Sequence, residues 1–194
     1  MTPKLDQQQN QGLDAHTSRR RFLQIGFGAT AGLVMPNAFA NLLTQPERKL
    51  SLLNLHTGES LNATYWAEGQ YQTSELQAIY RVLRDHRTGD VNEIDPNLVD
   101  LLNILHHKMN GKQAFHVISG YRSPKTNAKL SQYSNGVAKK SLHMQGKAID
   151  IRLPGRQLSE LRKTAFNLQA GGVGYYPKSD FIHVDTGRVR SWGS

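Results

Sequence analysis

Two short segments in the last third of the sequence alternate between apolar and reactive side chains, and this pattern constrains the fold more than any other feature. In residues 147–153 and 181–185, every second side chain is apolar. Successive side chains of a β-strand point to opposite faces, so each segment is predicted to be a strand with one face against a core. The other face carries Asp150 in the first segment, and His183 with Asp185 in the second. A sheet with reactive groups on one face is therefore expected.

The remaining patterns after residue 40 predict a single compact α+β domain, with a central antiparallel sheet flanked by helices. Alternating residues predict strands, and apolar side chains at helical spacing predict helices. Asp95 and Pro96 are typical of a helix N-cap and first turn. The expected strands are 50–55 and 59–66 as a hairpin, 115–119, 147–153, and a final antiparallel pair at 172–176 and 181–185; the expected helices begin at Thr73, at Asp95-Pro96 and near Ser159.

The first forty residues have the three parts of an export signal. A basic stretch at 18–24 precedes an apolar run at 25–35, and small residues lead to Ala40. The pair Arg19-Arg20 before Phe22-Leu23 resembles a twin-arginine signal. The alternative is an uncleaved N-terminal anchor, although the apolar run is short for a bilayer span. We expect residues 1–40 to be removed, residues 41–194 to act in the periplasm, and no stable membrane span to remain.

Composition excludes several function classes. The sequence has no cysteine, which excludes disulfides, Cys-ligated zinc, iron–sulfur clusters, a Cys nucleophile and a lipoprotein anchor. It also has no Gly-x-Ser-x-Gly elbow of a serine hydrolase. The net charge of +9 raises nucleic-acid binding, but the basic runs at 139–140 and 188–190 are short and lack a recognised module. We therefore expect no nucleic-acid partner and attribute the charge to the anionic cell envelope.

Two histidines and one acid could hold a divalent metal. His143 precedes Asp150 by seven positions, with Gly146 between them to turn the chain, and His183 lies on the later strand. Two imidazoles and a carboxylate supply three ligands and leave a fourth position open, as in catalytic zinc sites. A lone histidine is more often a surface or core residue, so from the residues alone the metal site and a purely structural role are about equally favoured.

Arg122 follows the strand at 115–119 within Ser-Gly-Tyr-Arg-Ser. Its planar guanidinium could hold a substrate carboxylate or carbonyl oxygen. The alternative is an ion pair with a structural Asp, and the spacing alone favours that alternative.

Three motifs in this order resemble the zinc D-Ala-D-Ala carboxypeptidase superfamily, which also includes murein endopeptidases and hedgehog-type domains. They are Ser-Gly-Tyr-Arg-Ser at 119–123, Ser-x-His-x-x-Gly-x-Ala-x-Asp at 141–150 and Asp-x-x-His-x-Asp at 180–185. Within the superfamily, the chain resembles the murein endopeptidase K family most. The stretches at 53–60, 136–141 and 171–177 and the twin-arginine leader carry that resemblance over nearly the whole mature chain.

The resemblance implies a role for each motif residue. His143, Asp150 and His183 would be zinc ligands, and Arg122 would bind and polarise the substrate near the scissile amide. Some relatives have an acid three residues before the last ligand, where this sequence has Asp180.

The general base is therefore either Asp180 or Asp185, and Asp185 could instead orient a ligand from its place two residues beyond His183. Tyr175, Tyr176 and Trp192 could line the cleft or belong to the core.

The function implied is an exported zinc metallopeptidase that hydrolyses peptide cross-links of peptidoglycan during wall growth or remodelling. The resemblance points to 3-3 links between two diaminopimelate residues, with peptidoglycan stem peptides as partners and Zn²⁺ as cofactor. Two alternatives stay open. One is a D-Ala-D-Ala carboxypeptidase of the same fold, and the other is a non-catalytic, zinc-bearing wall-binding domain.

Overall fold

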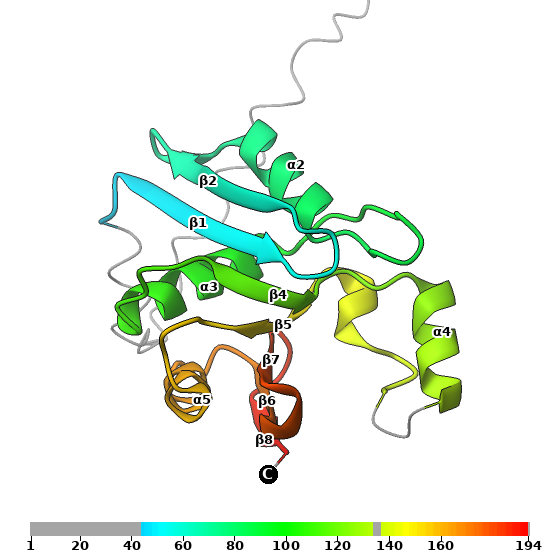
Figure 1. Ribbon diagram of the computed structural model, residues 1–194. Coiled ribbons are helices and arrows are strands. Elements are labelled where there is room, and N and C mark those ends of the chain that lie inside the picture. The colour runs from blue at the N-terminus through cyan, green and yellow to red at the C-terminus, as the bar shows by residue number, and fades with distance from the viewer. Residues whose placement is uncertain (1–43, 134–136, 194) are drawn as a thin grey trace, which may run out of the picture. The chain divides into compact units, whose positions relative to one another are not determined.

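A mixed eight-stranded sheet runs through residues 44–133 and 137–193, which are the residues that the computed structural model describes (Figure 1). The expected export signal at 1–40 lies outside them. The strand order is β3-β2-β1-β4-β5-β7-β6-β8. The strands are β1 (Glu47–Asn54), β2 (Ser60–Ala67), β3 (Gln70–Tyr71), β4 (Phe115–Ser119), β5 (Ala148–Arg152), β6 (Gly172–Tyr176), β7 (Phe181–Asp185) and β8 (Arg190–Trp192).

The expectation of an antiparallel sheet is wrong at two of the seven pairings. β1 pairs with β4 in parallel, and β6 pairs with β8 in parallel. A parallel pair needs a long crossover, which two helices provide between β1 and β4. After the β6–β7 hairpin, the chain passes back across β6 and adds β8 at the edge of the sheet. There β8 runs parallel to β6 and antiparallel to β7. The fold is α+β as predicted, with a mixed sheet.

Four α-helices accompany the sheet in the described residues: α2 (Thr73–Val82), α3 (Pro96–Lys108), α4 (Pro124–Tyr133) and α5 (Leu158–Asn167). Two short 3-10 turns, η1 (Leu142–Gln145) and η2 (Pro177–Ser179), complete the set. Asp95 caps α3 as predicted, because its carboxylate accepts from the backbone N–H of Asn97 at 3.0 Å. None of the described helices is long and apolar enough to cross a membrane.

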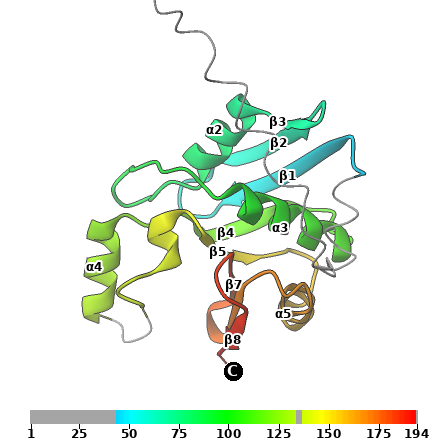
Figure 2. The same cartoon turned by 180° about the vertical axis from the view of Figure 1, so that it is seen from behind.

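The core lies on one side of the sheet. α2 packs on β2, α3 on β1, and α5 on β6 and β7 (Figures 1 and 2). Ile149 and Ile151 of β5 and Ile182 and Val184 of β7 are buried in this core. Their neighbours point the other way, so the alternation predicted for both strands is confirmed. That opposite face of β5 and β7 is where the reactive side chains gather.

Candidate metal centre

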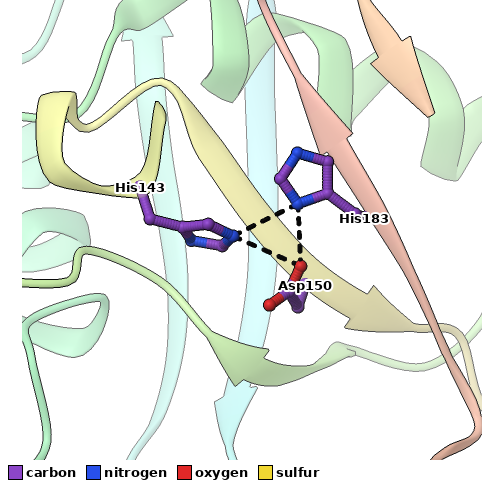
Figure 3. A group of neighbouring side chains, drawn as sticks. All are labelled: His143, Asp150 and His183. Atoms are coloured by element: carbon purple, nitrogen blue, oxygen red, sulfur yellow. Dashed lines mark hydrogen bonds and ion pairs between the residues drawn. The ribbon is translucent and has the colours of Figure 1, made fainter. Parts of the chain in front are cut away.

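The three predicted ligands meet at one point (Figure 3). β5 pairs with β7 so that Asp150 lies opposite His183, and η1 brings His143 over the pair. His183 Nδ1 lies 2.9 Å from Asp150 Oδ1 and 3.2 Å from His143 Nε2. His143 Nε2 lies 3.3 Å from the same carboxylate oxygen. All three side chains are almost fully buried.

Local backbone geometry sets the position of His143. The Ser141 side chain accepts from the backbone N–H of His143 and begins η1. Gly146 ends η1 in the left-handed region, with φ of 66°. A Cβ there would also collide with the carbonyl oxygen of Glu93. Gly146 thus makes the turn that the sequence predicted between the histidine and the strand of Asp150. A residue with a side chain does not fit at this position.

Each of the two imidazoles has hydrogen-bond partners at its ring nitrogens. His143 Nδ1 lies 2.7 Å from the carbonyl oxygen of Gly120, which can only accept, so Nδ1 donates. Both nitrogens of His183 face carboxylates: Nε2 lies 3.0 Å from Asp185 Oδ2, and Nδ1 lies 2.9 Å from Asp150 Oδ1. In the tautomer that donates from Nε2 to Asp185, His143 Nε2 and His183 Nδ1 both present lone pairs to the Asp150 carboxylate. Three acceptors then meet without a donor between them, which is an arrangement that fits a divalent cation.

Electrostatics keep the central carboxylate charged. Burial by itself raises the pKa of Asp150, but His143 and His183 outweigh it and hold the pKa below its usual range. For His183, burial lowers the pKa, and the neighbouring Asp150 and Asp185 carboxylates outweigh burial and raise it. Asp150 is therefore an anion at neutral pH, which is the state that a metal ligand needs.

A cleft of about 420 Å³ opens beside the three side chains. Tyr176 and Trp192 line it, whereas Tyr175 packs against the core. Lys140 and Arg190, which belong to the two short basic runs of the sequence, also line the cleft. The full lining is Arg122, Val137, Ala138, Lys140, Ser141, Leu142, His143, Asp150, Tyr176, Phe181, His183, Arg190 and Trp192.

Arg122 lies in this cleft with its hydrogen-bonding capacity largely unused. Its Nη2 is 3.7 Å from Asp150 Oδ2 and 3.4 Å from Ser119 Oγ, and its Nη1 is 3.5 Å from Asn127 Oδ1. These are long contacts for a guanidinium, and its buried Nε has no partner in the described part of the chain. Its carboxylate neighbour is thus the candidate ligand Asp150. The two Nη groups of Arg122 are therefore only weakly held and could turn to an oxygen of a ligand.

The segment after Arg122 is fixed by a buried acid that belongs to none of the sequence motifs. Asp85 accepts from the backbone N–H of Ser123 at 2.8 Å and from that of Arg87 at 2.9 Å. Burial alone raises the pKa of Asp85, but the hydrogen bonds from Thr126, Ser123 and Arg87 lower it from 3.8 to about 2. A single Asp with no regular spacing to the site gives no sequence signal for this role.

An Asp85→Asn substitution is expected to lower the free energy of unfolding by about 2 kcal/mol at pH 7, because the amide nitrogen would face a backbone N–H. The carboxylate stabilises the fold above about pH 4, and this contribution is lost as the pH falls towards 2. The difference between wild type and variant should shrink over that window. Urea unfolding at stepped pH measures it, and a difference that stays constant on acidification would contradict the assignment.

The two acids considered as general base lie in different surroundings. Asp185 is fully buried and accepts from His183 and Arg190, and its pKa is held below the usual range although burial alone raises it. Asp180 is exposed at the end of η2, where its carboxylate pairs with Arg152 at 2.6 Å. Neither is among the residues that line the cleft.

Comparison with known proteins decides the family. The family model described as peptidoglycan L,D-endopeptidase MepK matches residues 43–192. The chain belongs to this family. The resemblance to the murein endopeptidase K family that the motifs indicated is thereby confirmed.

Named members of the MepK family cover almost the whole chain. The peptidoglycan L,D-endopeptidase MepK of Escherichia coli K12 is 44% identical over 176 residues, which are 90% of this chain and 97% of that protein. The protein of the same name from Shigella flexneri matches equally. The probable peptidoglycan L,D-endopeptidase MepK of Haemophilus influenzae is 39% identical over 177 residues, or 90% of this chain and 95% of that protein.

Proposed function

We propose that this chain is an exported zinc metallopeptidase that hydrolyses peptide cross-links of peptidoglycan in the periplasm, with 3-3 diaminopimelate links as its substrate. The match to the MepK family over residues 43–192 carries the proposal. The convergence of His143, Asp150 and His183 in a cleft supports the metal-dependent part of it. The export signal that the sequence predicts at 1–40 is consistent with this location.

His143 Nε2, Asp150 Oδ1 and His183 Nδ1 would hold the zinc ion. Gly120 and Asp185 keep the two imidazoles in the tautomers that binding needs. When bound, zinc would polarise the scissile carbonyl and lower the pKa of a water to about 7. Arg122 would hold the oxygen that gains negative charge as the amide is attacked.

Asp180 is the acid that we assign to proton acceptance. Asp185 already accepts hydrogen bonds at both oxygens, whereas Asp180 has one partner, Arg152. Asp180 lies outside the cleft lining, so it would have to turn away from Arg152 to reach a water in the cleft. An Asp180→Asn substitution is expected to lower kcat about 10²-fold or more with unchanged zinc affinity, because general-base catalysis is worth roughly that much. Kinetics and metal titration of the same variant measure both quantities. Unchanged kcat would exclude Asp180.

The charges of the cleft favour an anionic substrate. Three cations, on Arg122, Lys140 and Arg190, line it against the single carboxylate of Asp150. Arg190 is paired with Asp185, which does not line the cleft. Lys140, by contrast, has no ion-pair partner within residues 44–133 and 137–193. A stem peptide carries free carboxylates that such an amine can attract.

A Lys140→Gln substitution is therefore expected to raise KM about 2- to 5-fold, the worth of one exposed ion pair, with kcat unchanged. Steady-state kinetics on cross-linked muropeptides at low salt measure the change. Lys139→Gln is the matched control, because Lys139 is adjacent and exposed but does not line the cleft. Equal effects from both variants would show that only the overall charge matters.

Digestion of intact sacculi tests the function itself. The purified chain, with and without a chelator, is incubated with sacculi and the muropeptides are separated. Loss of 3-3 cross-linked dimers that stops with chelator and returns with Zn²⁺ is expected. Loss of terminal D-Ala alone would indicate the carboxypeptidase alternative. Binding to the wall without any hydrolysis would indicate the non-catalytic alternative, and activity after complete metal removal would overturn the metal-dependent mechanism.

A further inference from the structure

Asp185 is the most tightly held acid of the site. Its side chain is fully buried and both oxygens accept. Oδ2 accepts from His183 Nε2 at 3.0 Å and from Arg190 Nη2 at 2.7 Å. Oδ1 accepts from Arg190 Nη1 at 3.1 Å and from the backbone N–H groups of Gly172 and Gly187 at 3.0 and 2.8 Å. The carboxylate is fixed from three sides, and the imidazole of His183 is fixed through it.

Arg190 comes from β8, the short edge strand that no sequence pattern predicted. β8 pairs with β6 so that Arg190 lies opposite Gly172 and Trp192 opposite Gly174. The Arg190 guanidinium lies 4.8 Å from the Trp192 ring centroid, and the Trp192 ring lies 5.2 Å from that of His183. β8 therefore reaches the candidate ligand by two routes, one polar and one aromatic.

Two glycines of β6 leave the space for this contact. A Cβ at Gly172 would meet the Arg190 guanidinium and Asp185 Oδ2. A Cβ at Gly174 would lie 2.7 Å from the Trp192 indole, which is closer than real Cβ contacts. Trp192 Nε1 in turn donates to the Tyr176 hydroxyl at 2.8 Å. The face of β6 is thus shaped to seat the two side chains of β8.

We infer that β8 holds a ligand of the metal centre in its binding position. Arg190 is a positioning residue: its bidentate pair locks Asp185, and Asp185 turns His183 so that Nδ1 faces Asp150. This inference rests on the proposed zinc site and adds to it a residue that supports a ligand without binding the metal itself. A carboxylate that supports a ligating histidine typically changes metal affinity by about 10- to 100-fold when it is lost.

Zinc affinity of the purified full-length chain tests the inference, measured by competition with a chromophoric chelator at one fixed pH. Arg190→Gln and Asp185→Asn are both expected to weaken zinc binding about 10- to 100-fold. Arg190→Lys should retain part of the affinity, because one ammonium can still donate to Asp185. Arg188→Gln is the matched control, because Arg188 is exposed and lies two residues before Arg190. This variant removes the same charge, and its zinc affinity should equal that of the wild type.

A spectroscopic measurement separates positioning from general destabilisation. The absorption bands of the Co²⁺-loaded chain report ligand geometry, and they should shift in Arg190→Gln but not in Arg188→Gln. The melting temperature of each metal-free variant shows whether the fold is intact. If Arg190→Gln does not fold, the zinc affinity and spectrum of Arg190→Lys are compared with those of the wild type instead. Wild-type affinity and spectrum in Arg190→Gln would overturn the role of β8 while leaving the proposed function standing. A wild-type chain that binds no zinc would overturn both.

Discussion

Replacing His143 with Ala is expected to abolish peptidoglycan hydrolysis and to remove tightly bound zinc from the purified chain. The substitution deletes one of three acceptors that converge within 3.3 Å and leaves two ligands, one fewer than the three protein ligands of catalytic zinc sites. Enzymes accelerate their reactions by at least about 10⁶-fold, so loss of the metal should lower activity by about 10⁴-fold or more. Muropeptide release from sacculi and elemental analysis of the same preparation measure the two effects.

His107→Ala is the control for this substitution. His107 is exposed near the end of α3 and has no described contact with the cleft. Its replacement is expected to leave activity and zinc content unchanged and to shift stability by less than about 0.5 kcal/mol. Wild-type hydrolysis by His143→Ala would exclude the triad as the catalytic metal centre, whatever its role in the fold.

Replacing Arg122 with Ala is the second large effect that we expect, with kcat falling about 10²- to 10³-fold. The guanidinium has only long contacts in the structure, and the charge that it would stabilise develops as the amide is attacked. Zinc content should stay at the wild-type level, because Arg122 supplies no ligand. Rapid-quench or steady-state kinetics, together with metal analysis, distinguish this outcome from that of a lost ligand.

Two further variants sharpen the test of Arg122. Arg122→Lys keeps the charge but loses the planar fork, so it should recover only part of kcat. Arg87→Ala removes an exposed cation from the neighbouring loop and should leave kcat unchanged. Full activity in Arg122→Lys would reduce the role of this residue to that of a point charge. Full activity in Arg122→Ala would remove it from the mechanism.

Local patterns predicted the parts of the fold that depend on strand and helix periodicity. The alternation in β5 and β7 placed Asp150 and His183 on one face, and the structure pairs them directly. Asp95 and Pro96 marked the start of α3. By contrast, no sequence pattern predicted α4, because its buried side chains are the polar Thr126 and Asn127 and no apolar stripe marks it.

Contacts between distant segments account for what the sequence did not reveal. The parallel pairing of β8 depends on where the chain returns after β7, and three residues give no usable period. The proton on His143 Nδ1 depends on the carbonyl of Gly120, which is distant in the chain and carries no side-chain signal. The support of Asp185 by Arg190 likewise depends on a turn between two strands. These features require the tertiary structure.

The edge strands of the described sheet are short, and this limits how a peptide can approach it. β3 has two residues and β8 has three, so the described sheet ends on both sides with little unpaired backbone. A long free edge is the usual template for an added strand, either from a second copy or from an extended ligand. A stem peptide should therefore be gripped by its charged groups and its reacting amide, and not as a ninth strand. Recognition of that kind reads chemical groups and tolerates the alternating stereochemistry of wall peptides, which a regular β-ladder would not accommodate.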